Sequence, residues 1–130
     1  MEVVVDANIF LAVLLNEPDN ERIIEATRGV SFIAPEILPY EIGNALSSSL
    51  KRKHIDENEV LFAYQLFTQI PVRRTYVDIP AALELVNRFK IYAYDACYLE
   101  VAQRLNLPLF TLDTQMKEKA ELLKLKIWNV

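Results

Sequence analysis

The chain alternates between short runs of apolar residues and longer stretches in which apolar residues recur at helical spacing. The short runs predict strands over residues 2–5, 31–34, 72–76, 107–112 and 126–130. The periodic stretches predict helices over residues 7–15, 18–29, 56–70, 80–89, 93–105 and 114–122, and one more that begins at Pro35 or Pro39 and ends near Lys53. Because strands that alternate with helices are typical of parallel crossovers, the pattern predicts an α/β fold, a three-layer sandwich with a parallel sheet covered on both faces.

The length and composition of the chain fit a single domain. The 130 residues, of which 52% are hydrophobic, are enough to build a full core without disulfides. The single cysteine, Cys97, excludes an intrachain disulfide and suits a reducing compartment. No secretory signal is visible, and the longest purely apolar stretch, residues 9–15, is too short to cross a bilayer. We therefore expect a single domain over residues 1–130 in a cytoplasmic protein without membrane contact.

Several kinds of functional site are excluded by what the chain lacks. Its only two glycines, Gly29 and Gly43, cannot form a glycine-rich phosphate loop. Its only histidine, His54, cannot build a multi-histidine zinc site. The net charge of −4 argues against an extended nucleic-acid surface but leaves room for a small RNA site. The pair Arg73 and Arg74, within a predicted strand, fits either protection of a sheet edge or contact with RNA.

Two acidic residues follow predicted strands at opposite ends of the sequence. Asp6 follows the run 3–5, and Asp113 follows the run 109–112. Each position also fits a helix N-cap, because Asp accepts hydrogen bonds from the first free amides of a helix. Ligands of parallel sheets bind beyond the carboxyl ends of the strands, however, where Asp6 and Asp113 would lie side by side if their strands were neighbours.

Two further acidic residues lie early in predicted helices. On a helical wheel, Asp95 falls within an apolar arc, opposite a polar arc that contains Glu100. The apolar arc consists of Tyr98, Leu99, Val101, Ala102 and Leu105. A buried carboxylate is costly unless it is paired, so Asp95 needs a partner such as a cation. Glu41 lies at the margin of an apolar arc, with Asn44 and Ser48 on the same flank. For both acids the alternative is a solvated residue in the first turn that complements the helix dipole.

Four converging carboxylates indicate a site for a hard cation. Without cations they would repel one another and some of their pKa values would rise. Mg²⁺ and Mn²⁺ prefer oxygen ligands of this kind. Such an ion can polarise a phosphate and lower the pKa of a bound water, which suits hydrolysis of a phosphodiester to a 5′-phosphate and a 3′-hydroxyl.

The motifs that carry these acids resemble those of the PIN-domain ribonucleases, and within them the VapC-like toxins of toxin–antitoxin pairs. The resemblance rests on residues 3–8, 39–46, 94–102 and 107–113, in this order and spacing. It implies a five-stranded parallel sheet in the order 3-2-1-4-5 and an endoribonuclease dependent on Mg²⁺ or Mn²⁺. It implies an acidic site of Asp6, Glu41, Asp95 and Asp113, supported by Asn8, Asn44 and Thr111. It also implies an antitoxin partner, RNA as the substrate and a homodimer, and the apolar residues 9–15 favour a dimer independently.

The chain departs from the family pattern at two places. Ala7 stands where the family often has Thr or Ser, and Thr114 to Met116 stand where some members carry a further acid, which bears on a second metal ion more than on the first. Two other functions compete with a nuclease: a PIN fold that binds without catalysis, and a receiver domain that is phosphorylated on Asp. A receiver would need adjacent acids after its first strand, and the sequence Asp6-Ala7-Asn8 lacks that pair.

Overall fold

A parallel sheet of four strands forms the middle of the molecule. The computed structural model describes residues 1–130, with strands β1 (Glu2–Val5), β2 (Ser31–Pro35), β3 (Val72–Thr75) and β4 (Leu109–Phe110). Their order is β3-β2-β1-β4, and every pairing is parallel. The α/β architecture is therefore confirmed, and the order of these four strands agrees with the expected 3-2-1-4.

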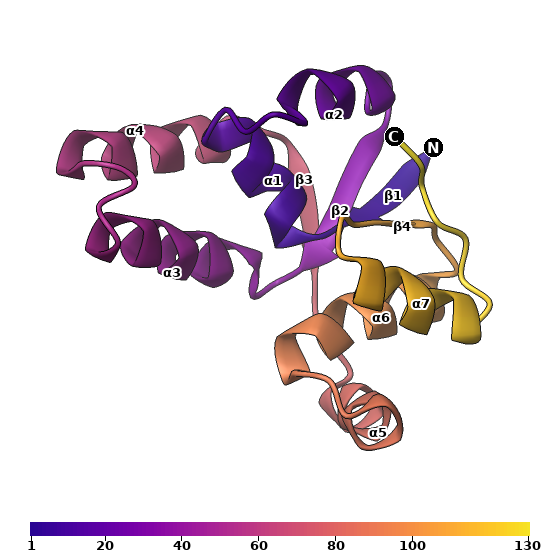
Figure 1. Cartoon of the computed structure of the whole chain (residues 1–130). Helices are drawn as coiled ribbons and strands as arrows, with labels where there is room; N and C mark the ends of the chain where they lie inside the picture. The colour runs from indigo at the N-terminus through magenta and orange to yellow at the C-terminus, as the bar shows by residue number, and fades with distance from the viewer.

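Seven helices flank the sheet on its two sides, and α3 and α4 extend away from it beyond α1 (Figure 1). One layer contains α1 (Ala7–Leu14), α2 (Asn20–Ala26), α3 (Leu38–Lys51) and α4 (Glu57–Thr68), and the other contains α5 (Ile79–Phe89), α6 (Ala93–Leu105) and α7 (Thr114–Leu122). Helix α1 packs against α2, α3 and α4, whereas α6 lies directly against β1, β2 and β4. The result is a three-layer α/β/α sandwich.

The expected fifth strand over residues 126–130 is wrong. Only Ile127 pairs with the sheet, as an isolated parallel bridge to Leu109 on the free side of β4. Two backbone hydrogen bonds make this bridge, from the Leu109 N–H to the Lys126 carbonyl and from the Trp128 N–H to the Leu109 carbonyl, both at 2.9 Å. The indole of Trp128 then donates to the carbonyl of Ala26 at 3.1 Å, next to α2. This anchor draws the segment off the edge of β4, which is itself only two residues long.

Local sequence signals explain where the helices begin. Pro35 ends β2, so Pro39 is the proline in the first turn of α3. Asp56 and Glu59 form a reciprocal capping box at the start of α4, with hydrogen bonds of 2.8 and 3.0 Å. Helix α2 ends three residues before the expected Gly29, which instead adopts a φ of +71° in the turn to β2.

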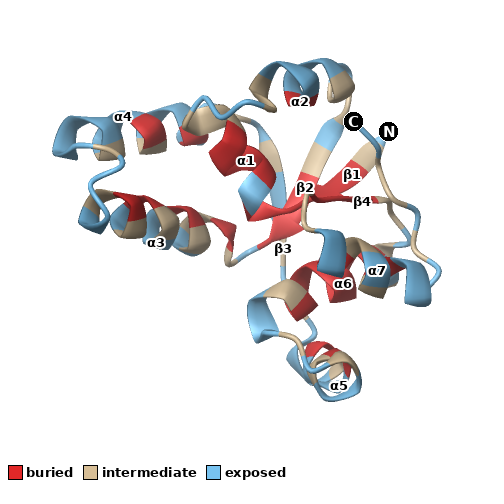
Figure 2. Cartoon of the chain, viewed as in Figure 1, coloured by how far each residue is buried: buried red, intermediate tan, exposed pale blue.

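Burial is concentrated in β1, α1 and α6 (Figure 2). One cluster of 27 buried hydrophobic residues forms the core. Ile9, Phe10, Leu11 and Ala12 belong to it, because α2, α3 and α4 enclose α1 within the same chain. The apolar run over residues 9–15 therefore gives no separate argument for a dimer, and the homodimer stays a prediction. None of the helices has the length and apolar character needed to cross a membrane.

Candidate functional site

The carboxyl ends of β1 and β4 lie side by side and bring Asp6 and Asp113 together. Val5 pairs with Phe110, so the residues that follow the two strands are adjacent. The hydroxyl of Thr111 joins them: it donates to Asp6 Oδ2 at 2.8 Å and accepts from the backbone N–H of Asp113 at 3.1 Å. Thr111 is fully buried, so it fixes this part of the site rigidly.

Asp6 is a buried acid with few compensating contacts. Its residue is only 5% exposed, and although it occupies the N-cap position of α1, its side chain makes no capping hydrogen bond. Burial raises the pKa of Asp6 to about 6, and the charge of Asp95 contributes to the rise. The hydroxyl of Thr111 and the nearby amides of Ala7 and Asn8 lower the pKa of Asp6 by smaller amounts. The capping alternative therefore does not explain Asp6.

Asp113, in contrast, does cap a helix. Its Oδ1 accepts from the backbone N–H groups of Gln115 at 2.9 Å and Met116 at 3.3 Å, at the start of α7. The remaining oxygen, Oδ2, makes no hydrogen bond to protein. Asp113 thus caps α7 with one oxygen. Its charge also acts on the acidic group, because it raises the pKa of Asp95.

Glu41 is held in place by a buried tyrosine of α6. The hydroxyl of Tyr98 donates to Glu41 Oε1 at 2.7 Å, and Tyr98 is only 1% exposed. Burial, against the lowering effect of the Tyr98 hydroxyl and together with the charges of Asp6 and Asp95, raises the pKa of Glu41 to about 7. Glu41 belongs to the first turn of α3, but it is not the solvated residue of the alternative interpretation.

Asp95 lies between the other acids at the start of α6. It is half-buried, as the helical wheel predicts, and burial together with the charge of Asp113 raises its pKa. The charge of Asp95 in turn raises the pKa values of Asp6 and Glu41. The sequence-predicted acids are therefore all brought into one electrostatically coupled group.

The four carboxylates are oxygen ligands of the kind that a hard cation prefers, but they do not converge on a single point. None of the four acids makes a salt bridge with Lys or Arg, so their mutual repulsion is not offset within the chain. At the same time, no three acidic, His or Cys side chains converge into a group that could hold an ion as they stand. Two sets of hydrogen bonds contribute to the separation of the carboxylates: Asp113 accepts from amides of α7, and Glu41 accepts from Tyr98. The four acids are coupled through their charges, and changes of side-chain rotamer would be needed to bring them around one ion.

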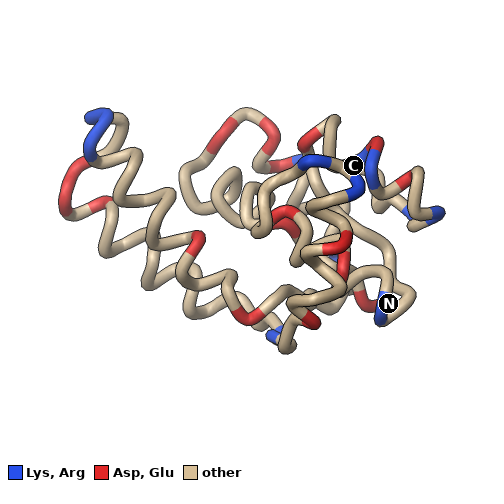
Figure 3. Tube along the Cα trace, turned by 90° about the horizontal axis from the view of Figure 1, so that it is seen from below, with Lys and Arg blue, Asp and Glu red and all other residues tan.

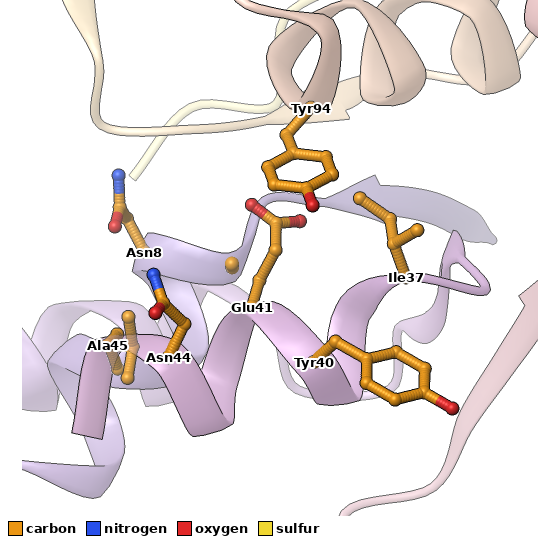
Figure 4. A pocket seen from close by; sticks show the side chains of 9 residues that line it. Asn8, Ile37, Tyr40, Glu41, Asn44, Ala45 and Tyr94 are labelled. Atoms are coloured by element: carbon orange, nitrogen blue, oxygen red, sulfur yellow. The ribbon is translucent and has the colours of Figure 1, made fainter. Parts of the chain in front are cut away.

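A cavity of about 630 Å³ opens beside Glu41 (Figure 4). Asn8 and Asn44 lie at one end of it, Glu41 and Tyr94 face each other near its middle, and the ring of Tyr40 extends away at the other end. Both asparagines are exposed and make no hydrogen bond to protein through their side chains. The supporting residues thus differ: Thr111 orients the acids directly, whereas Asn8 and Asn44 border the adjoining cavity.

Some residues of this region were missed by the sequence. Tyr98 was assigned to packing on the apolar arc, and the signal that it has a further role is its hydroxyl, which must find a partner when buried. Glu100 was placed on the polar arc but is only 3% exposed. It accepts from the N–H of Asp78 at 3.0 Å and from Arg104 Nε at 2.8 Å, outside the acidic group. Cys97 is buried, and burial raises the pKa of its thiol to about 11, which leaves it unreactive.

Acidic and basic positions are both spread along the whole trace in Figure 3. At the site itself the four acids have no basic partner, so a phosphate that approached them would meet negative charge unless cations were bound there.

Sequence comparison places these features in a known family. The family model described as "PIN domain" matches residues 3–122. Ribonuclease VapC9 of Mycobacterium tuberculosis is 28% identical over 121 residues, which cover 92% of this chain and 91% of that protein. Ribonuclease VapC3 of Pyrobaculum aerophilum is also 28% identical, over 127 residues that cover 92% of this chain and 95% of that protein.

Comparison of structures supports the same fold. The VapBC2 structure from Rickettsia felis, solved with a DNA fragment from its promoter, contains a chain that superposes with a TM-score of 0.68. The two chains are 16% identical, and the match covers 99% of this chain and 100% of that one. At this identity the likeness concerns the fold.

Proposed function

We propose that this chain, which belongs to the PIN-domain family, is an endoribonuclease that depends on Mg²⁺ or Mn²⁺. The observation that carries the proposal is the coupled group of Asp6, Glu41, Asp95 and Asp113, in which burial and like charge raise three pKa values and no basic side chain offers a counter-charge. Relatives named ribonucleases, matched over nine-tenths of the chain, support the choice of RNA as the substrate.

The four carboxylates are the residues that would hold the cation. When bound, Mg²⁺ or Mn²⁺ polarises a phosphate and lowers the pKa of a coordinated water. The protein contributes orientation. Thr111 fixes Asp6 Oδ2 and the Asp113 backbone, and Tyr98 fixes Glu41 Oε1, so two acids from distant parts of the sequence keep defined positions.

Glu41 is also suited to move a proton. In the ion-free chain its pKa is raised to about 7, so a Glu41 that is not bound to the ion exchanges protons near neutral pH, the range in which a general base is most effective. Its Oε1 is occupied by Tyr98, whereas Oε2 has no partner in the chain, and the side chain lines the cavity. In that state Glu41 Oε2 would take a proton from the attacking water. The water oxygen bonds to phosphorus, the bond from phosphorus to the 3′-oxygen breaks, and that oxygen takes a proton from solvent, which leaves a 5′-phosphate and a 3′-hydroxyl.

The test is cleavage of structured RNAs by the purified protein with Mg²⁺, with Mn²⁺ and with EDTA, followed by mapping of the ends. We expect cleavage with either ion, none with EDTA, and loss of cleavage in Asp6→Asn and in Glu41→Gln. Persistent cleavage by either variant, above a mock-purified control, would remove that residue from the site.

We further propose that the protein is the toxin of a toxin–antitoxin pair and forms a homodimer. Two groups of exposed apolar side chains are available for protein partners. One consists of Leu61, Phe62 and Leu66 on α4, and the other of Tyr76, Ile79 and Leu83 at the start of α5. Structures of VapBC complexes superpose on this chain, which supports an antitoxin as one partner. A monomer in sedimentation at micromolar concentration would contradict the homodimer without affecting the nuclease.

A binding scaffold of the same fold is the second candidate. One observation favours it: no three acidic side chains already converge on a point. The cleavage experiment separates the two, because a scaffold would bind RNA or protein but leave every RNA intact with either ion.

A further inference from the structure

Two neighbouring hollows of the surface share one residue, Tyr40. The first is the cavity beside Glu41. The second, of about 390 Å³, is lined by Glu36, Pro39, Tyr40, Tyr64 and Arg74. An extended ligand that runs from the acidic group along the first hollow would therefore reach Tyr40 before Arg74. Figure 4 shows the first part of this path, with the Tyr40 ring directed away from Glu41 at the far end of the first hollow.

Tyr40 is an aromatic side chain with nothing packed on it. It is 80% exposed and takes part in no ring–ring or cation–π contact, unlike Phe67 or Tyr76. Its hydroxyl makes no hydrogen bond to protein, so neither end of the side chain is engaged. Both faces of the ring are thus available to a flat partner, which a nucleic-acid base is.

Arg74 is the basic residue that this path reaches. It lies on β3, the edge strand, where neighbouring side chains point to opposite faces of the sheet. Arg73 points to the face opposite that of Arg74 and pairs with Glu2 at 3.2 Å. Arg74 makes no salt bridge and no side-chain hydrogen bond, and it lines the second hollow. Protection of a sheet edge accounts for Arg73, but it does not explain why Arg74 faces the same hollow as Tyr40.

We propose that Tyr40 and Arg74 form a subsite for single-stranded RNA, in which Tyr40 stacks on an unpaired base and Arg74 binds a neighbouring phosphate. This rests on the proposed nuclease function, since it supplies the part of the substrate next to the cleaved bond. Only a base outside a helix can stack on a protruding ring, so the subsite selects loops and single strands over duplexes. Arg74 would supply a cationic contact for a phosphate at the other end of the path, away from the four acids.

Glu36 lines the second hollow as well, and its exposed carboxylate would repel the phosphate that Arg74 binds. It forms no salt bridge with Arg74, so it does not neutralise the guanidinium. Removal of the Glu36 charge should therefore strengthen RNA binding, whereas removal of the Tyr40 ring or the Arg74 charge should weaken it.

The experiment measures binding of a short fluorescein-labelled single-stranded RNA by anisotropy, with Mg²⁺ present. The full chain carries Asp6→Asn so that the probe stays intact. Adding Tyr40→Ala should raise Kd about tenfold, the effect expected for loss of one stacked base, and Tyr40→Trp should keep or improve the affinity. Tyr92→Ala is the matched control, because Tyr92 is 85% exposed and lines neither hollow. The same RNA annealed to its complement should bind weakly and be indifferent to Tyr40→Ala.

Salt dependence tests the second half of the subsite. Arg74→Ala should lower the slope of log affinity against log salt concentration by about 0.7, the value for one phosphate contact with a single strand. Arg73→Ala should leave the slope unchanged, and Glu36→Gln should tighten binding.

Two outcomes would overturn the subsite: unchanged affinity in both Tyr40→Ala and Arg74→Ala, which would assign this surface to a protein partner instead, or equal losses in the Tyr92 and Arg73 controls. Failure of the nuclease looks different. If the wild-type chain cleaves no RNA but the variants follow the predicted pattern, the subsite stands and the nuclease proposal falls.

Discussion

Two acids in this protein are equally buried but differ in what surrounds them. Glu100 is 3% exposed and accepts hydrogen bonds from Arg104 and from the N–H of Asp78. Asp6 is 5% exposed, has a single side-chain hydrogen bond, from Thr111, and has Glu41 and Asp95 as charged neighbours. Burial of a charge is costly in both places. At Glu100 the chain supplies the compensation, whereas at Asp6 the compensation must come from outside the chain, so only Asp6 indicates a binding site.

The Glu100 region should show the largest effect on stability. Arg104→Ala leaves the Glu100 carboxylate buried with one amide donor, so we expect a loss of about 3 kcal/mol in the free energy of unfolding, measured with urea. Arg28→Ala, which breaks the exposed pair with Glu25, should cost under about 1 kcal/mol. If the two variants lost the same stability, Glu100 would not be a compensated structural acid.

The acidic group should make the stability of the protein depend on pH. In the folded chain the pKa values of Asp6 and Glu41, about 6 and about 7, lie above the ordinary 3.8 and 4.5. Between the ordinary and the raised values the folded state binds more protons than the unfolded state, so stability falls as the pH rises through this interval and levels off above about 7. In EDTA, the protein should be more stable at pH 5.5 than at pH 7.5, by on the order of 2 kcal/mol.

The control for this pH dependence is the double variant Asp6→Asn/Glu41→Gln, whose profile over the same range should be flatter. Mg²⁺ or Mn²⁺ should also narrow the wild-type difference, since the ion binds the ionised carboxylates. A free energy of unfolding that rises with pH for the wild type in EDTA would contradict the account.

Asp95→Asn tests whether like charge destabilises the group. The substitution keeps the shape and removes repulsion from Asp113, so the variant should be more stable than wild type in EDTA. Added Mn²⁺ should shrink or reverse the difference, because the wild type binds the ion better. Thermal melts with and without Mn²⁺ measure this. If Asp95 only complements the dipole of α6, the variant is instead less stable by up to about 1 kcal/mol, with or without the ion.

The smallest effect concerns Tyr98. Tyr98→Phe removes one hydrogen bond to Glu41, which should cost about 1 kcal/mol of stability. Since that bond lowers the pKa of Glu41, its loss should shift the rise of the cleavage rate with pH toward higher pH. Tyr94→Phe, whose hydroxyl makes no hydrogen bond, is the matched control. A purely packing role for Tyr98 predicts a stability loss without any shift of the pH profile.

The sequence pattern predicts the acidic group better than it predicts the surroundings of that group. Asp6 and Asp113 follow strands that are adjacent in the sheet, and the wheel correctly predicts the half-buried position of Asp95. The same wheel is wrong for Glu100, because periodicity within α6 carries no information about the β3–α5 connection that covers this side of the helix. Contact with Arg104 and the Asp78 N–H makes burial of Glu100 tolerable. Arg104 lies one turn further along α6, so that pair is local, whereas the contact with the Asp78 N–H depends on tertiary structure.

The fifth strand illustrates the same limit at the level of the fold. Residues 126–130 have a suitable apolar content, but pairing requires a partner strand of matching length. β4 has only two residues, and Trp128 is held by the carbonyl of Ala26, which is far away in the sequence. Hydrogen bonds between distant segments decided the outcome in both cases, and a local pattern does not contain them.

The central claim is that the four acids form one site for a divalent cation, and calorimetric titration with Mn²⁺ at pH 7.5 tests it most directly. The wild-type chain should bind Mn²⁺ in a saturable manner, Asp6→Asn and Asp95→Asn should each lose most of this affinity, and Glu25→Gln, an exposed acid paired with Arg28, should match wild type. Saturable binding that survives in both Asp6→Asn and Asp95→Asn, or no binding by the wild type, would contradict the account.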